Sequence, residues 1–385
     1  MGAADLARPG AAMQREGMEH LGYLAPLARD LVRIDSRSSR SNLAVAERLM
    51  AELSGFEVER LDYTDVAGVP KCVLVAARGA GGLALSGHMD TVPDTGWTDD
   101  PWSGRIEGDT LHGLGSTDMK GPVAAIIAAA RALPAHVPVA LLLTTDEETT
   151  KAGARLIADR SALARRFAPR GILVAEPTGM APVRGHRGNV EFRAVATGVQ
   201  AHSSTGQGRN ANWDLLPFLT EMRALHDRLR GAPELQDPAY DPPFSDFNLV
   251  LDNHGAAVNI TAPKATATIK YRYSRSIDPA PVVAAVQDAA DRAGLMLTVT
   301  MQGAPPELPA GHPLVAMAIA LTDQGTQTAP YGTDASELQA LAPCVILGPG
   351  SMNDAHKPTE SVSLSALAAA VPVFMRLAVG VAAPH

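Results

Sequence analysis

The chain is poor in cysteine and in aromatic side chains. Only Cys72 and Cys344 occur among 385 residues, and Phe, Trp and Tyr together account for 4%. Two isolated cysteines without a CxxC pair exclude a disulfide framework and a thiolate-based zinc site. We therefore expect a protein of a reducing compartment, the cytoplasm.

Clusters of basic residues and long uninterrupted apolar runs are also missing. The net charge is −8 and no Lys/Arg-rich block is present, so we do not expect a nucleic acid as a partner. The most apolar segments, 123–133 and 366–383, contain Arg or Pro, so we expect no membrane-spanning helix. Residues 1–20 lack a basic segment followed by an apolar one, and export is not expected.

The composition is that of a globular protein large enough for two domains. Hydrophobic residues make up 46% and charged residues 19% of the 385 residues, whereas one typical domain has roughly 150 residues. Between residues 72 and 176, apolar strand-like segments alternate with helical ones, which predicts a sheet covered by helices on both faces. The predicted strands are 72–77, 83–88, 139–148 and 171–176, and the predicted helices are 20–34, 122–133 and 152–160.

The pattern changes near residue 184. Strands are predicted at 190–198, 265–274 and 295–303, and helices at 213–229 and 281–294, an order typical of a small ferredoxin-like α/β unit. The Pro-rich stretch 232–247 is predicted to be a loop. Beyond Gly303 a helix at 313–325, a strand at 344–350 and a helix at 365–380 follow. We predict an α/β fold in which 184–302 is inserted between the two parts of a larger domain, 1–183 and 303–385.

Residue types that bind metal ions stand where the predicted strands end. His88 ends one strand, Asp118 precedes a helix, Glu148 ends another strand and Glu176 a third. Asp118 follows His88 by 30 residues, Glu148 follows Asp118 by 30, and Glu176 follows Glu148 by 28. Each step is about one strand–helix unit of ~30 residues, which returns the chain to the same sheet edge. We expect the four side chains to converge there.

Glu147 and Glu148 form an adjacent pair of carboxylates after an apolar strand. The negative charges of the two carboxylates repel each other unless a cation is near or one carboxylate is protonated. Histidine and carboxylates without cysteine suit zinc, cobalt or manganese.

Seven short motifs are distributed over nearly the whole chain. They are GHMDTVP (87–93), GLGSTDMKG (113–121), TTDEE (144–148), AEPT (175–178), GVQAHSS (198–204), YGTD (331–334) and GPGSMNDAHKPTE (348–360). In sequence and in order they resemble the motifs of the M20 family of dinuclear metallohydrolases, in particular its acetylornithine deacetylase branch. The resemblance implies a catalytic domain with an inserted lid and dimerisation domain, and a homodimer.

The resemblance also implies a set of ligands for two divalent ions. His88 and Glu176 would hold one ion, Glu148 and His356 the other, and Asp118 would bridge both. Zinc is the favoured metal, with cobalt and manganese as alternatives.

Three further residues receive roles in catalysis. Glu147, the member of the pair that is not a ligand, would take a proton from a water shared by the ions. Asp90 lies two residues after His88 on an extended segment and can orient its imidazole. By resemblance, His202 of the inserted domain would donate to the oxyanion in the partner subunit's active site.

Five residues are candidates for binding the substrate. Arg275 and Arg187 carry guanidinium groups, which match a carboxylate with two hydrogen bonds. By resemblance, Asn259, Gly332 and Thr333 stand where the family places polar groups against its substrates.

The resemblance implies hydrolysis of the amide bond of an N-acyl amino acid, with N-acetylornithine as the best single candidate. A succinyl-diaminopimelate desuccinylase, an acetylcitrulline deacetylase, a dipeptidase or a carboxypeptidase would keep the same metal ligands. A non-catalytic binding protein on this fold is a further alternative. The presence of Glu147 argues against it, because a protein without chemistry needs no proton acceptor beside a full ligand set.

Overall fold

The computed structural model describes residues 11–383, and the chain forms two compact units. The first comprises the chain up to Gly185, Pro306–Gln327 and the chain from Thr333 onward. The second comprises His186–Pro305 and Thr328–Gly332. The second unit thus consists of one long segment and one short one. That residues 184–302 form an inserted lid domain stays a prediction.

A mixed sheet of eight strands forms the centre of the first unit, in the order β1-β2-β6-β3-β7-β14-β8-β13. The four strands β6, β3, β7 and β14 are mutually parallel. Strand β2 pairs antiparallel with β1 and β6, and β8 pairs antiparallel with β14. The prediction of a mixed α/β sheet flanked by helices is confirmed. The strands are β1 (Glu57–Thr64), β2 (Pro70–Arg78), β3 (Leu83–His88), β6 (Val139–Thr144), β7 (Gly171–Val174), β8 (Val183–His186), β13 (Gln327–Ala329) and β14 (Cys344–Ile346).

The parallel strands β3, β6 and β7 consist of buried residues throughout. His88 at the end of β3 pairs with Thr144 at the end of β6, and Ser86 pairs with Val174 at the end of β7. This register brings the segments that follow the three strands to one edge of the sheet. Loops at the carboxyl edge of parallel strands are the usual place for ligands in α/β folds.

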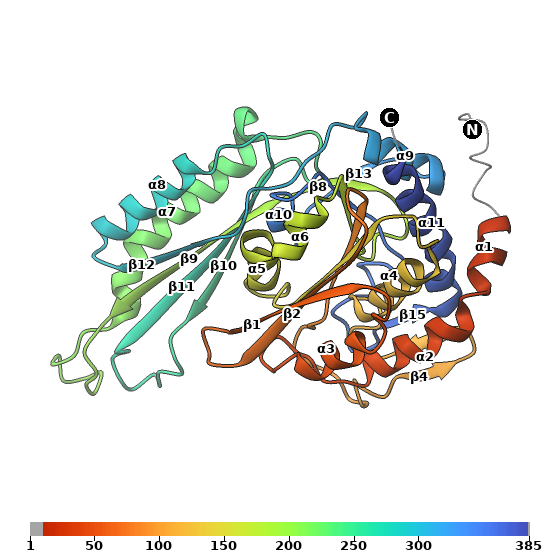
Figure 1. Ribbon diagram of the computed structural model, residues 1–385. Coiled ribbons are helices and arrows are strands. Elements are labelled where there is room, and N and C mark those ends of the chain that lie inside the picture. The colour runs from red at the N-terminus through yellow and green to blue at the C-terminus, as the bar shows by residue number, and fades with distance from the viewer. Residues whose placement is uncertain (1–10, 384–385) are drawn as a thin grey trace. The chain divides into compact units, whose positions relative to one another are not determined.

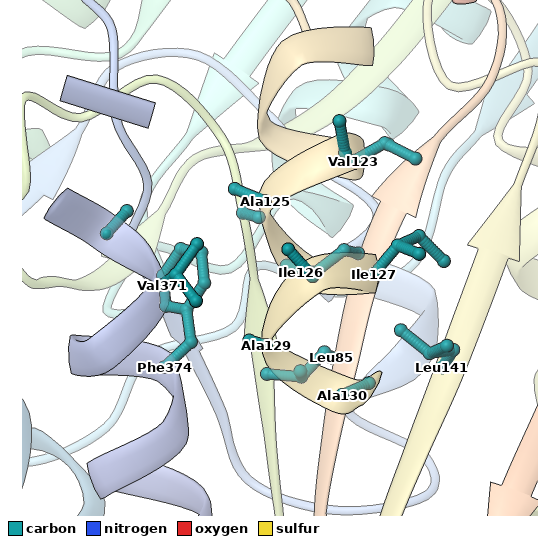
Figure 2. Close-up of a cluster of buried hydrophobic side chains, with 14 of the residues drawn as sticks. Leu85, Val123, Ala125, Ile126, Ile127, Ala129, Ala130, Leu141, Val371 and Phe374 are labelled. Atoms are coloured by element: carbon teal, nitrogen blue, oxygen red, sulfur yellow. The ribbon is translucent and has the colours of Figure 1, made fainter. Parts of the chain in front are cut away.

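Helix α4 (Lys120–Ala132) packs between the sheet and helix α11 (Leu364–Ala382). Figure 2 shows Val123, Ile126 and Ile127 on α4, with Leu141 on one side and Phe374 on the other. Residues 123–127 of α4 are at most 1% exposed. Full burial of one such aliphatic side chain stabilises the fold by about 1.5–3 kcal/mol. This packing holds α4 in place, and Asp118 lies two residues before its first residue, Lys120.

Among the described residues, α11 is the one helix long and apolar enough to cross a bilayer, judged by length and composition alone. Its apolar window is 61% buried inside the protein, and it packs against α4 and the helices at the start of the chain. Core helices pass the same test of length and composition. In this structure α11 is part of the core.

The remaining elements of the first unit cover the sheet or tie down its loops. A small sheet in the order β15-β5-β4 holds the end of the last motif, because Gly113 N donates to Glu360 O at 3.1 Å. The elements are α1 (Ala11–Met18), α2 (Leu21–Val32), α3 (Leu43–Met50), α5 (Ala152–Arg160), α6 (Ala162–Phe167), α9 (Pro313–Thr322), α10 (Ala335–Leu338), β4 (Arg105–Glu107), β5 (Thr110–His112) and β15 (Ser361–Ser363).

The second unit is an antiparallel sheet in the order β10-β11-β9-β12 with two helices packed on it (Figure 1). Phe192, Phe218, Tyr271 and Val286 belong to its separate hydrophobic core. Strand β10 was not predicted, and the Pro-rich stretch is irregular apart from a short 3₁₀ turn, Pro233–Leu235, and the start of β10. The elements are α7 (Ala211–Gly231), α8 (Ala280–Arg292), β9 (Gly188–Thr197), β10 (Asp246–Asp252), β11 (Lys264–Tyr273) and β12 (Met296–Met301).

Candidate metal centre

Histidine and carboxylate side chains gather at the carboxyl edge of the parallel strands. One ligand atom from each of His88, Asp118 and Glu148 lies within 4.8 Å of the other two. His356 joins them, because its Nε2 is 3.0 Å from Glu148 Oε1. The loop that carries His356 follows β14, so residues far apart in the sequence meet at one place.

Asp118 stands between the two imidazoles. Its Oδ1 is 3.1 Å from His88 Nε2, and its Oδ2 is 3.2 Å from His356 Nε2. One carboxylate thus presents an oxygen to each of two separate histidines. This is the arrangement that a carboxylate needs to bridge two cations.

Glu176 completes the cluster of predicted ligands. It follows β7 by two residues and is 4% exposed. Burial and the negative charge of Asp118 raise the pKa of Glu176, while the charge of His88 opposes the shift. The structure thus brings His88, Asp118, Glu148 and His356 together, and Glu176 interacts electrostatically with Asp118 and His88. That these five residues are the metal ligands stays a prediction.

The charges of this cluster call for bound cations. Burial and the charge of Asp118 raise the pKa of Glu148 to about 7. Hydrogen bonds with Asp118 and Glu148 raise the pKa of His356 to about 11. Three carboxylates confined together are costly unless protons or metal ions neutralise them. The donor set, with imidazole nitrogens and carboxylate oxygens and no sulfur, fits zinc, cobalt or manganese.

The metal-free protein is expected to lose stability as the pH rises from about 5 to about 7. Burial is the largest cause that raises the pKa of Glu148, Asp334 and Glu360 to about 7 each, whereas a free carboxyl group titrates near 4. The folded state therefore holds protons that the unfolded chain has released. This stabilisation is complete below the unfolded pKa and is lost as the pH rises through the folded pKa.

Divalent ions are expected to reverse this dependence, since they replace the protons and bind better as the ligands deprotonate. Thermal unfolding from pH 5 to 7, with and without metal, checks both statements. A melting temperature of the metal-free protein that increases with pH would contradict the proposed proton-binding cluster.

Asp90 links the first ligand to the glutamate pair. Its backbone carbonyl accepts a hydrogen bond from His88 Nδ1 at 3.0 Å, which leaves Nε2 for the metal side. Its carboxylate is farther from Nδ1, at 3.6 Å, and accepts from the backbone N–H groups of Glu147 and Glu148 at 3.2 and 3.4 Å. Ser38 Oγ also donates to Asp90 at 2.7 Å. Asp90 thus orients His88 mainly through its main chain, and its side chain holds the turn that carries Glu147.

Glu147 has a partner that we did not predict. Lys151 Nζ donates to Glu147 Oε1 at 2.7 Å, and both side chains are largely buried. A second buried lysine, Lys71, pairs with Asp146 at 2.9 Å, and Tyr63 donates to the same carboxylate at 2.7 Å. The turn after β6 is therefore held by two separate ammonium groups.

Glu360 and Asp334 also support the cluster and were not predicted. Glu360 Oε1 accepts from the backbone N–H groups of Thr117 and Asp118 at 2.9 and 3.0 Å, which fixes the start of the Asp118 segment. Asp334 accepts a hydrogen bond from Thr144. Burial, followed by the charge of Glu147, raises the pKa of Asp334 to about 7.

The other predicted residues belong to the second unit, except Thr333. His202 is exposed, and its Nδ1 accepts from Ser204 N at 3.3 Å. Asn259 is exposed, and its backbone carbonyl accepts from Ser203 N at 3.0 Å. Gly332 lies at the end of the segment 328–332. Thr333 is buried in the first unit, where its Oγ1 accepts from Ala335 N at 3.1 Å.

The two candidate arginines differ in their surroundings. Arg187 is 2% exposed, donates to the carbonyl of Pro242, and has its guanidinium carbon 5.4 Å from the ring centre of Tyr240. These contacts tie the Pro-rich stretch to the sheet of the second unit. Arg275 is exposed and makes one 3.3 Å hydrogen bond to the carbonyl of Pro305. Arg187 thus has a structural role within the second unit, and the binding of a substrate by Arg275 stays a prediction.

Residues 84–379 match the model of peptidase family M20/M25/M40. The chain belongs to this family. Among curated M20 relatives, an acetylornithine deacetylase from Proteus mirabilis is 33% identical over 353 residues, which cover 86% of this chain and 88% of the relative.

Solved structures agree with the M20 assignment at the level of the fold. A di-peptidase from Saccharomyces cerevisiae superposes with a TM-score of 0.76 at 15% identity, covering 97% of this chain and 99% of the other. A dinuclear metal-binding M20 peptidase from Bacillus subtilis superposes with a TM-score of 0.61 at 17% identity, covering 94% and 98%. The M20 protein described here is therefore an enzyme, a metal-dependent amidohydrolase of a dinuclear family with a candidate metal site.

Proposed function

We propose that this M20 enzyme hydrolyses the amide bond of an N-acyl amino acid, with N-acetylornithine as the first candidate substrate. The observation that carries the proposal is Glu147, a buried carboxylate beside the predicted ligand set. The 33% identity to a curated acetylornithine deacetylase over most of both chains supports the choice of substrate.

The roles of the chain's own residues follow from their contacts. Two divalent ions, zinc foremost, held by the five ligands would polarise the amide carbonyl and lower the pKa of a water molecule. Glu147 takes the proton from the attacking water and later delivers it to the leaving amine. Asp90 keeps the backbone of Glu147 and the ring of His88 in place during this exchange.

A substrate panel tests the proposal. The purified protein, loaded in turn with Zn²⁺, Co²⁺ and Mn²⁺, is offered N-acetylornithine, acetylcitrulline, succinyl-diaminopimelate and a set of dipeptides. The expected result is the highest kcat/KM on N-acetylornithine. Cleavage of dipeptides without hydrolysis of any N-acyl amino acid would replace the deacetylase proposal with a dipeptidase, because the metal ligands would be the same.

We place the enzyme in the cytoplasm. Cys72 and Cys344 are both free and buried. Free thiols without a disulfide partner are typical of reducing compartments.

We further propose that the enzyme is a homodimer whose second units meet. Strand β10 is the last strand of its sheet, so one edge is unpaired. It exposes Val250 and Leu251 by 57% and 56%, and helix α7 beside it exposes Trp213 by 70%. An apolar edge strand with an apolar helix can pair with its own copy about a two-fold axis, which covers both features at once.

Charges on this surface are expected to separate the dimer. Trp213→Glu combined with Leu251→Lys would bury charges in the proposed contact, so the mass in solution should fall from two chains to one. Light scattering after size exclusion measures this change. The matched control is Val66→Glu, which alters a fully exposed valine in the turn between β1 and β2 and should leave the mass unchanged. A wild type that is monomeric at all concentrations would contradict the proposal.

His202→Ala is expected to lower kcat by about 10²–10³-fold with the metal content unchanged, as for the loss of one oxyanion donor. If the partner subunit supplies His202, co-expressed His202→Ala and Glu147→Gln chains should recover about a quarter of wild-type activity, because half the dimers are mixed and hold one intact site. Full kcat in His202→Ala would exclude the oxyanion role. If the co-expressed chains recover no activity, the partner subunit does not supply His202.

A further inference from the structure

Lys151 is an uncommon residue for its position. Its side chain is 4% exposed, and its Nζ is 2.7 Å from Glu147 Oε1. Its backbone has φ +56°, in the left-handed region that residues other than glycine seldom adopt. Burying an ammonium group is costly unless it is paired. Such costs persist where the surroundings hold the residue in place, often at functional sites.

The turn that carries Lys151 is closed tightly on itself. Lys151 N donates to Asp146 O at 2.7 Å, and Gly153 N donates to Thr145 O at 3.2 Å. A Cβ on Gly153 would lie 2.4 Å from Thr145 O, so only glycine permits this approach. Helix α5 therefore starts directly against the end of β6, and the Lys151 side chain returns to Glu147.

Glu147 stands among other carboxylates. Its negative charge is one cause of the raised pKa of Asp334 and of Glu176, so these groups repel it. The positive charge of Lys151 acts on Asp334 in the opposite direction. Lys151 is thus the cation in hydrogen-bond contact with Glu147 among the described residues.

We propose that Lys151 is a positioning residue for the proton acceptor: its ammonium holds Oε1 of Glu147 and leaves Oε2 as the oxygen that takes and returns the proton. This inference rests on the proposed role of Glu147 in hydrolysis. Lys71 serves the same turn differently, because it pairs with Asp146 and donates to the carbonyls of Ser38 and Arg40. Lys151 is the member of the pair that acts on the reacting group.

Three substitutions separate positioning from support of the fold. Lys151→Met keeps the length of the side chain but loses the ammonium, and a misplaced proton acceptor is expected to lower kcat by about 10–100-fold. KM and metal content should stay within twofold of wild type. Lys151→Arg restores a donor to Oε1 and should recover part of kcat. Lys151→Gly accepts the positive φ without cost, so full activity in this variant would mean that Lys151 only shapes the turn and would overturn the proposal.

Double substitutions test whether Lys151 acts through Glu147. In a Glu147→Gln background, Lys151→Met should cause no further loss of the residual kcat, since the group it positions is already disabled. An equal fold loss in both backgrounds would overturn the proposal.

Thermal unfolding tests the same coupling without a substrate. Lys151→Met should lower the melting temperature of the metal-free wild type by a few degrees. The same change should not lower it in Glu147→Gln, where the buried ammonium has lost its charged partner. Equal shifts in both backgrounds would overturn the inference whether or not a substrate is known. A wild type that is inactive on the whole substrate panel would instead refute the proposed function. The comparison of melting temperatures would still measure the coupling between Lys151 and Glu147.

Discussion

Glu147→Gln is expected to lower kcat by about 10²–10⁴-fold, the usual loss when a general base is removed. The amide has nearly the same size as the carboxylate and can still accept from Lys151, but it cannot take a proton from water. The metal content should remain that of wild type, because Glu147 is not among the ligands that converge on Asp118. Steady-state kinetics on the best substrate, together with elemental analysis of the same sample, measures both quantities.

The neighbouring residue provides a matched control. Glu148→Gln changes the same chemical group one position later, but Glu148 Oε1 faces His356 at 3.0 Å. This variant should lose metal as well as activity. If Glu147→Gln lost metal and Glu148→Gln kept it, the two roles would have to be exchanged. A Glu147→Gln enzyme with wild-type kcat would remove the proton acceptor from the mechanism.

Asp118→Asn is expected to reduce the metal content from two ions per chain to less than one and to abolish activity. Both oxygens of Asp118 face an imidazole, at 3.1 and 3.2 Å, so one substitution weakens both halves of the cluster. An amide has one oxygen and no charge, and it cannot bridge two cations. Metal titration by calorimetry and elemental analysis after dialysis measure the loss.

Asp159→Asn is a suitable control, because Asp159 is an exposed residue of α5 in the same unit. It should bind two ions with wild-type affinity. An Asp118→Asn protein that retained two ions at wild-type affinity would show that the five residues do not share one dinuclear centre.

Most of the candidate centre could be predicted from spacing alone. His88, Asp118, Glu148 and Glu176 follow one another through successive strand–helix units, and parallel strands return such residues to one edge. His356 follows the insertion, so no spacing rule connects it to the others. Only the resemblance of its motif to the M20 family singled it out.

The supporting residues could not be predicted in this way. Glu360 and Asp334 contact the site through a backbone N–H and a hydroxyl group from distant parts of the chain. Lys151 lies close to Glu147 in sequence, but only the left-handed turn directs it there. The spacing of four residues from Glu147, with a glycine two positions later, was a local signal that could have been used.

The predicted fold was incomplete at the edges of both sheets. Strand β1 is an edge strand with no buried residue, and β10 buries only Phe247. Hydrophobic pattern marks strands that lie in a core, and edge strands gain their stability mainly from backbone pairing. The parallel strands β3, β6, β7 and β14 were predicted, because each of them begins as a continuous apolar run. The predicted strands 139–148 and 344–350 were too long, since β6 ends at Thr144 and β14 at Ile346, and the interior strand β8 was not predicted.

The placement of β14 has a consequence for how the protein is made on the ribosome. This strand pairs with β7 through residues 344 and 172, and His356 follows it. A growing chain therefore exposes four of the five ligands long before the fifth has been synthesised, while the whole second unit emerges in between. With the proposed ligand set, stable uptake of both ions must wait until residue 356 has been synthesised, so a product terminated before β14 would lack both the finished sheet and a complete set of ligands.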